Sequence, residues 1–306
     1  MKTQFKFIKY TKLWFALSTI AILIGIGAMV NNKMKTGHFI ELGIDFTGGT
    51  VMEIKFDKKD DNKTQSIKKA VDAAVAKNTI SQITITDKDT YIIQGKTLSN
   101  EQYETAKKAI KDSVGKFEEI RFNTIGPKIG ATLKNKAFIA LTIAIIAIVL
   151  YIAYAFRKVP KRVSPWKFGV SAIVALVHDI AITLGIFALL GFEVDAFFIT
   201  ALLTIMGFSV HDTIVVFDRV RENLKNQGRD DTFGDIADMS LNQTLTRSIN
   251  TSISTLFTLV ALYFLGADSL KIFVFALIIG IFVGTYSSIF IASPVLTFWQ
   301  ERKRVR

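Results

Sequence analysis

The chain has 306 residues, half of which are apolar, with a formal net charge of +12 and no cysteine. This apolar composition excludes an ordinary soluble enzyme, and the lack of cysteine excludes disulfides and thiolate metal sites. Three scattered histidines do not predict a metal site either.

Six apolar runs predict six transmembrane helices. Each has roughly 18–25 residues, the length that crosses about 30 Å of hydrocarbon. The runs span residues 13–30, 137–156, 168–190, 196–217, 249–265 and 272–298. The first is expected to remain as an anchor, because its apolar core is too long for a signal peptide and no clear cleavage site follows it.

The distribution of lysine and arginine predicts the orientation. Both ends of the chain and the 157–167 connection are basic, whereas the connections after the third and fifth runs are mostly acidic. By the positive-inside rule both termini are cytoplasmic, so the net charge does not require nucleic acid. Four parts are expected: a cytoplasmic N-terminus with the first helix (1–31), an extracytoplasmic domain (32–136), five helices with a cytoplasmic loop at 218–246 (137–298) and a basic cytoplasmic tail (299–306).

The hydrophilic insert between the first two runs has the size of a small domain. Its patterns predict strands at 50–56, 80–86, 91–94 and 118–124, with a turn at 87–89, a helix at 63–77 and a second helix that a capping box opens at Ser99. The order β-α-β-β-α-β is that of ferredoxin-like α+β domains. The other hydrophilic connection, 218–246, is expected to form a short helix and turn with a solvated face.

Ionisable side chains lie on three consecutive runs. Asp212 is inside the fourth run, Asp179 is deep in the third, and Arg247 opens the fifth. A carboxylate in hydrocarbon costs several kcal/mol, so a proton or ion site is the favoured interpretation of Asp212; the alternative is polar glue between helices. Asp179 either serves the same relay or is simply held by His178 or a serine.

Hydroxyl side chains continue from Arg247 along the fifth run. Their spacings of four, three and four predict one polar stripe on that helix, formed by Arg247, Thr251, Ser254 and Thr258. On the fourth run Ser209 shares a face with Asp212. If the two faces meet, Asp212 and Arg247 can pair, and protonation of the acid would release the arginine.

Two segments carry a family resemblance. One follows the first run and contains Gly43, Asp45, Phe46, Thr47, Gly48 and Gly49. The other ends the fourth run and contains His211, Asp212, Asp218, Arg219, Arg221, Glu222 and Asn223. With the segments 177–192 and 241–247, they resemble the SecF family of the bacterial Sec protein translocase, and the resemblance covers essentially the whole chain.

The resemblance implies a polytopic subunit in the cytoplasmic membrane that contributes six helices to a bundle like that of resistance–nodulation–division (RND) transporters. SecD supplies the other half, and the pair uses the proton-motive force to promote preprotein export. In the family the fourth-run acid and the arginine opening the fifth are implicated in proton passage; here they are Asp212 and Arg247. The implied partners are SecD, the SecYEG channel, YajC or YidC, and the preprotein, with no cofactor and no hydrolytic site.

Several alternatives stay open at this point. A proton-driven exporter of small molecules or lipids has a similar architecture, although such exporters usually have twelve spans and two inserts. Whether Na⁺ replaces H⁺ is also open, as are the roles of His178 and His211. The glycines at 43–49 favour a tight chain reversal with positive φ over an anion-holding turn. Gly280 and Gly284 suit close helix packing, either within the chain or against SecD.

Overall fold

The computed structural model describes residues 5–56, 63–85, 90–157, 163–226 and 232–301. The chain forms two compact units. One is the insert, Leu42–Phe138, and the other combines the segments before and after it.

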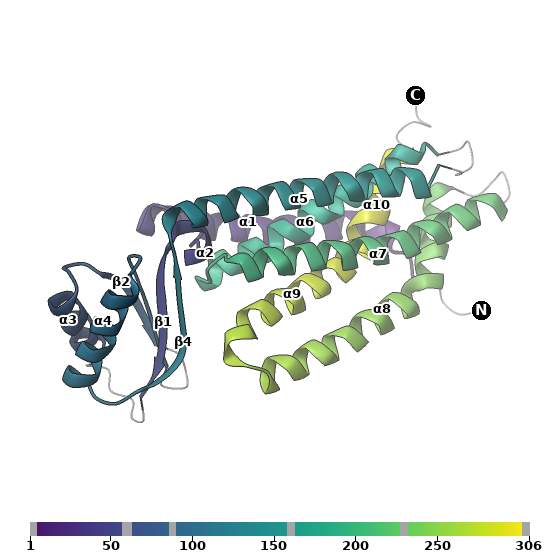
Figure 1. Cartoon of the computed structure of the whole chain (residues 1–306). Coiled ribbons are helices and arrows are strands. Elements are labelled where there is room, and N and C mark those ends of the chain that lie inside the picture. The colour runs from purple at the N-terminus through teal and green to yellow at the C-terminus, as the bar shows by residue number, and fades with distance from the viewer. Residues whose placement is uncertain (1–4, 57–62, 86–89, 158–162, 227–231, 302–306) are drawn as a thin grey trace. The chain divides into compact units, whose positions relative to one another are not determined.

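The insert has the predicted ferredoxin-like topology. Its antiparallel sheet has the strand order β2-β3-β1-β4, formed by β1 (Gly49–Lys55), β2 (Ile80–Ile85), β3 (Thr90–Gly95) and β4 (Glu118–Ile125). Helices α3 (Lys63–Ala74) and α4 (Asn100–Ser113) pack on one side of it (Figure 1), where Ile54, Ile67 and Ile110 are fully buried. The capping box at Ser99 is present, with Gln102 as its partner. The predicted turn at 87–89 lies outside the described residues.

The glycine segment before β1 reverses the chain, as predicted. A single helical turn, α2 (Ile44–Thr47), is followed by Gly48 and Gly49, whose φ angles are +74° and +136°. A Cβ on Gly48 would stand 2.7 Å from Pro127 Cα. Both the backbone conformation and the lack of space therefore require glycine there.

All six predicted transmembrane helices are present among the described residues. They are α1 (Thr11–Thr36, preceded by the short η1, Ile8–Tyr10), α5 (Pro127–Ala155), α6 (Pro165–Leu190), α7 (Ala196–Asn226), α8 (Phe233–Leu265) and a last span built from η2 (Asp268–Leu270), α9 (Lys271–Ser287), η3 (Ser288–Ala292) and α10 (Ser293–Glu301). Helix α9 packs against α6, α7 and α8, and α1 packs against α6. Figure 1 shows α8 and α9 joined as an antiparallel pair by the short η2 turn.

The 218–246 segment differs from its expected form as a short helix and turn. Helices α7 and α8 continue through it, leaving only 227–232 between them. Side-chain contacts stabilise the continuation. Asn223 donates to Ser240 Oγ (2.8 Å) and to Gln243 Oε1 (2.9 Å). Phe233 and Leu241 are buried. Only part of the segment is therefore a solvated face.

The last span is not one continuous α-helix. A π-helical segment, η3, separates α9 from α10, which the apolar pattern of residues 272–298 does not reveal. Before this break, Gly280 and Gly284 face α7, where added Cβ atoms would stand 2.1 Å from Ile205 and 3.0 Å from Ser209. The small-residue face thus serves close packing within the chain.

Candidate functional site

Asp179 is fully buried and has several hydrogen-bond partners. It is 1% exposed, and its Oδ2 accepts from Ser209 Oγ on α7 (2.6 Å) and Ser287 Oγ on α9 (2.9 Å). Its Oδ1 lies 2.9 Å from Nδ1 of His178. The close approach of α9 at Gly284 allows two helices to supply donors to one carboxyl group. Both alternatives for this acid thus remain: the histidine and the serines hold it, and the same contacts suit a relay.

A chain of hydrogen bonds leads from His178 to α1. His178 Nε2 is 3.0 Å from Ser18 Oγ, Ser18 donates to Tyr286 Oη (3.2 Å), and Tyr286 donates to the Trp14 carbonyl (3.0 Å). A carbonyl only accepts, so each hydroxyl must pass its single hydrogen toward Trp14. Ser18 then accepts from an Nε2–H of His178.

This direction determines how many protons His178 and Asp179 hold between them. With Nε2 protonated, the 2.9 Å contact between His178 Nδ1 and Asp179 Oδ1 needs one more proton between nitrogen and oxygen. Without that proton, two lone pairs would face each other in a buried site. The pair therefore holds one shared proton and is neutral overall, whether as imidazolium and carboxylate or as imidazole and carboxylic acid.

Asp212 is buried like Asp179 but has fewer partners. It is 5% exposed, and within the described residues its carboxylate has one hydrogen bond, from Ser288 Oγ at 2.5 Å. Ser288 begins the π-helical segment of the last span. The same hydroxyl lies 3.0 Å from the Thr285 carbonyl, so its one hydrogen has two acceptors.

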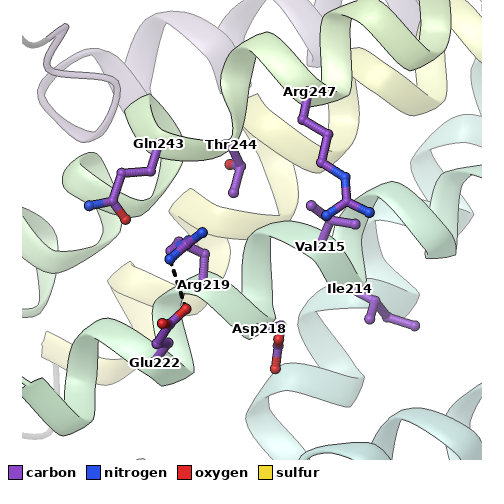
Figure 2. A pocket seen from close by; sticks show the side chains of 8 residues that line it. All are labelled: Ile214, Val215, Asp218, Arg219, Glu222, Gln243, Thr244 and Arg247. Carbon is purple, nitrogen blue, oxygen red and sulfur yellow. Dashed lines mark hydrogen bonds and ion pairs between the residues drawn. The ribbon is translucent and has the colours of Figure 1, made fainter.

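Arg247 does not pair with Asp212 in the structure. Asp212 is buried on the side of α7 that meets the last span, whereas Arg247 is on the exposed side of α8. In the part of the chain that the structure describes, its guanidinium has no hydrogen bond and no ion pair. Figure 2 shows it extending from α8 toward Val215 on α7, at a cavity of about 290 Å³.

The hydroxyl stripe of α8 also faces outward. Thr251, Ser254 and Thr258 are exposed, and each donates to the backbone carbonyl four residues earlier, over 3.0, 2.8 and 3.3 Å. The predicted common face with Arg247 is present, but it does not meet the face that carries Ser209 and Asp212. Ser209 bonds Asp179 instead.

The charged residues after Asp212 stabilise the end of α7. Asp218 pairs with Arg221 (2.5 Å) and Arg219 with Glu222 (2.8 Å). Asp218, Arg219 and Glu222 line the cavity (Figure 2). Arg221 also donates to the Ala155 carbonyl at the end of α5 (3.4 Å), where a helix attracts a cation. Their geometry indicates a structural role.

His178 and His211 differ despite a similar place beside an acid. His178 contacts Asp179, whereas the exposed His211 has no hydrogen bond to Asp212 among the described residues. Only the first histidine therefore belongs to the buried network.

The sequence prediction did not include the polar residues of the last span. Four consecutive residues contact four different helices: Thr285 contacts Ser252 of α8 (2.5 Å), and Tyr286, Ser287 and Ser288 reach α1, α6 and α7. A signal for them does exist, because Thr285-Tyr286-Ser287-Ser288 is a polar run within an apolar span. Lipid-facing positions would favour apolar side chains.

Comparison with known families agrees with this architecture. The family model of the C-terminal part of the protein export membrane proteins SecD/SecF matches residues 105–302, and the model of the SecD/SecF GG motif matches residues 40–60. Together with six membrane-length helices, these matches define a multi-pass membrane protein of the SecD/SecF export class.

Individual relatives show which family of this class the chain belongs to. The protein translocase subunit SecF of Thermobaculum terrenum is 41% identical over 280 residues, covering 87% of each chain, and that of Synechocystis is 37% identical, covering 96% of this chain and 93% of the relative. The chain belongs to the SecF family of protein translocase subunits, which act in Sec-dependent protein export. The role named for these relatives is transport.

A solved structure shows the same fold. The crystal structure of SecDF from Thermus thermophilus, described as a translocon-associated membrane protein, is 32% identical and superposes with a TM-score of 0.85 over 98% of this chain. A super-membrane-facing form of SecDF matches with a TM-score of 0.68 and 31% identity. The chain spans about two fifths of the first of these (39%), so its six helices correspond to half of an RND-like bundle.

Proposed function

We propose that this chain acts with a SecD-type partner to couple the proton-motive force to preprotein export, and that Asp212 carries the proton. The contrast between the two buried acids supports this role. Among the residues that the structure describes, Asp179 has three hydrogen-bond partners, whereas Asp212 has a single hydroxyl donor. We therefore assign the mobile proton to the acid that neighbouring side chains hold through fewer contacts.

The driving force sets a scale for the coupling. One charge crossing 100 mV is worth about 2.3 kcal/mol, so several protons are needed for each sizeable mechanical step.

Asp179 and His178, which share a proton, form the proposed second proton site of the relay. Their hydrogen-bond chain to α1 gives this site a connection to a further helix.

The outward stripe of α8 supports a partner subunit. Arg247 and the hydroxyls of Thr251, Ser254 and Thr258 would face hydrocarbon if this chain were alone in the membrane. Lipid offers no hydrogen-bond partner to a guanidinium, and it favours apolar side chains over hydroxyls. We propose that SecD covers this face and that Arg247 finds its carboxylate in the assembled pair. SecYEG, YajC or YidC, and the preprotein complete the proposed set of partners.

The proposed location is the cytoplasmic membrane, with both termini and the end of α7 inside and the insert outside. The basic termini support this orientation by the positive-inside rule. An RND-type exporter of small molecules or lipids is not favoured, because the relatives are protein translocase subunits.

The test is gradient-stimulated export of a reporter preprotein by inverted vesicles containing Asp212→Asn with its SecD partner. The amide keeps the volume and hydrogen-bonding capacity but cannot release a proton, so stimulation should be lost while assembly is normal. The matched control is Asp268→Asn, a change in the η2 turn where Asp268 pairs with Lys271, and it should behave like wild type. If well-assembled Asp212→Asn showed the same gradient-stimulated export as wild type, the proposal would be wrong.

A further inference from the structure

The two buried acids are linked by neighbouring residues of the last span. Ser287 donates to Asp179 on α6 and Ser288 donates to Asp212 on α7. Consecutive residues of a helix point in directions about 100° apart, so they can reach two different helices. Both serines are fully buried.

Each of these hydroxyls has one hydrogen and two acceptors. Ser288 Oγ is 2.5 Å from Asp212 Oδ2 and 3.0 Å from the Thr285 carbonyl. Ser287 Oγ is 2.9 Å from Asp179 Oδ2 and 3.1 Å from the Gly284 carbonyl. A hydroxyl that donates to the carboxylate cannot donate to the carbonyl at the same time.

The proton on Asp212 decides which acceptor Ser288 uses. When Asp212 is ionised, Ser288 donates to the carboxylate; when Asp212 is protonated, its own O–H can donate to Ser288, and the serine turns to the Thr285 carbonyl. That carbonyl lies where α9 passes into the π-helical segment. Serine bonds to a preceding carbonyl are known to bend helices, and π-helical segments often mark functional sites.

We infer that Ser288 is a positioning residue that sets the proton affinity of Asp212 and transmits its charge state to the break in the last span. The inference rests on the proposed function, since it assigns the residue that controls the proposed proton carrier. Ser287 has no equivalent influence, because Asp179 keeps Ser209 and His178 as partners when Ser287 is removed.

Other ionisable groups near Asp212 do not replace this control. The helices packed against α7 carry Asp179 and His178 on α6, Arg247 on α8 and Tyr286 on α9, and α7 itself carries His211. None of the five has a hydrogen bond to Asp212 among the described residues.

The experiment is an infrared pH titration of the purified complex with its SecD partner, following the carboxylic-acid band that disappears in Asp212→Asn. In Ser288→Ala the ionised carboxylate has lost its one donor, so the midpoint should move to higher pH by about one unit. Ser288→Thr keeps the hydroxyl and should restore the wild-type midpoint. Ser287→Ala, an equally buried neighbouring change, should shift it by less than about a third of that.

The outcomes separate the two proposals. An unshifted midpoint in Ser288→Ala, or an equal shift in Ser287→Ala, overturns the inference even when Asp212→Asn abolishes gradient-stimulated export. Stimulation that survives Asp212→Asn while the midpoint shifts as expected overturns the proposed function and leaves the control by Ser288 intact. Ser288→Cys is the second variant if Ser288→Ala does not assemble, because the thiol is a weak donor of similar size. It should give an intermediate shift of the midpoint. An unshifted midpoint in Ser288→Cys also overturns the inference.

Discussion

Buried acids of the same type can have different roles when their donors differ. Asp179 and Asp212 have nearly equal exposure, but one is held by donors from three residues and the other by one. Hydrogen bonds to a buried carboxyl group replace part of the hydration that it loses on burial. The donor set, rather than burial alone, therefore distinguishes the proposed proton carrier from its more tightly held neighbour.

Outside the membrane helices, one residue pair makes the insert sensitive to acid. Lys107 Nζ lies 2.5 Å from Glu119 Oε2, and this contact, followed by that with Tyr103, lowers the pKa of Glu119 below its usual value. The pair joins α4 to β4. The Lys107 side chain is 38% exposed, so solvent screens much of the interaction.

The sign of the pH effect follows from the lowered pKa of Glu119. Its contribution to stability is present above the unfolded value of about 4.3 and is lost as the pH falls through the folded value. We expect the insert to lose a few tenths of a kcal/mol in this window, and Glu119→Gln to lack that loss. Hydrogen exchange of α4 and β4 amides in the whole chain, corrected for intrinsic rates, measures it. The control is the exposed Glu104→Gln, and an acid response that persists in Glu119→Gln would contradict the assignment.

The sequence could identify the important residues better than their partners. Asp212, Asp179 and Arg247 stand out because charges in apolar runs are rare. Helical spacing shows which residues share a face, but it does not show which neighbouring helix that face meets. The two faces that would allow Asp212 to pair with Arg247 do not meet among the described residues, whereas the polar run 285–288 contacts both acids.

At the scale of elements, close helix contacts place the hydrogen-bonding groups. Helices α1 and α6 approach where Gly25 faces Gly185, and a Cβ on either would stand 2.8 Å from the backbone of the other. Ser18, which connects to His178, is two turns before Gly25 on α1. Periodicity predicts the helices, but the π-helical break and this contact depend on neighbours distant in sequence.

This contact gives a prediction with a control on the same helix. Gly25→Ala should separate α1 from α6 and lower the stability of the chain by about 1–3 kcal/mol, because the obstructing atoms are backbone and cannot turn aside. Gly27→Ala meets no atom within 4 Å and should be neutral or slightly stabilising. Thermal unfolding in detergent compares the two variants. Equal melting temperatures would show that the helices do not pack as closely as described.

At the scale of the whole molecule, the six helices have a polar face that none of the described residues covers. The sequence predicted the stripe, but a stripe has the same spacing whether it faces the bundle, a partner or lipid. The stripe is exposed in the structure, so it faces either a partner or lipid. The guanidinium of Arg247 at the end of the stripe favours the proposed partner over lipid.

The stripe can be tested by making it apolar. If SecD covers this face, Ser254→Leu combined with Thr258→Leu should weaken co-purification with SecD or abolish gradient-stimulated export, because bulky side chains replace hydroxyls at a packed polar contact. The chain itself should stay as stable as before, since both hydroxyls bond only their own helix backbone. The control is Phe264→Leu, an exposed apolar change on the same helix, which should have little effect. A double variant that is normal in both association and stimulation would mean that lipid covers this face, and the proposed arrangement with SecD would then be wrong.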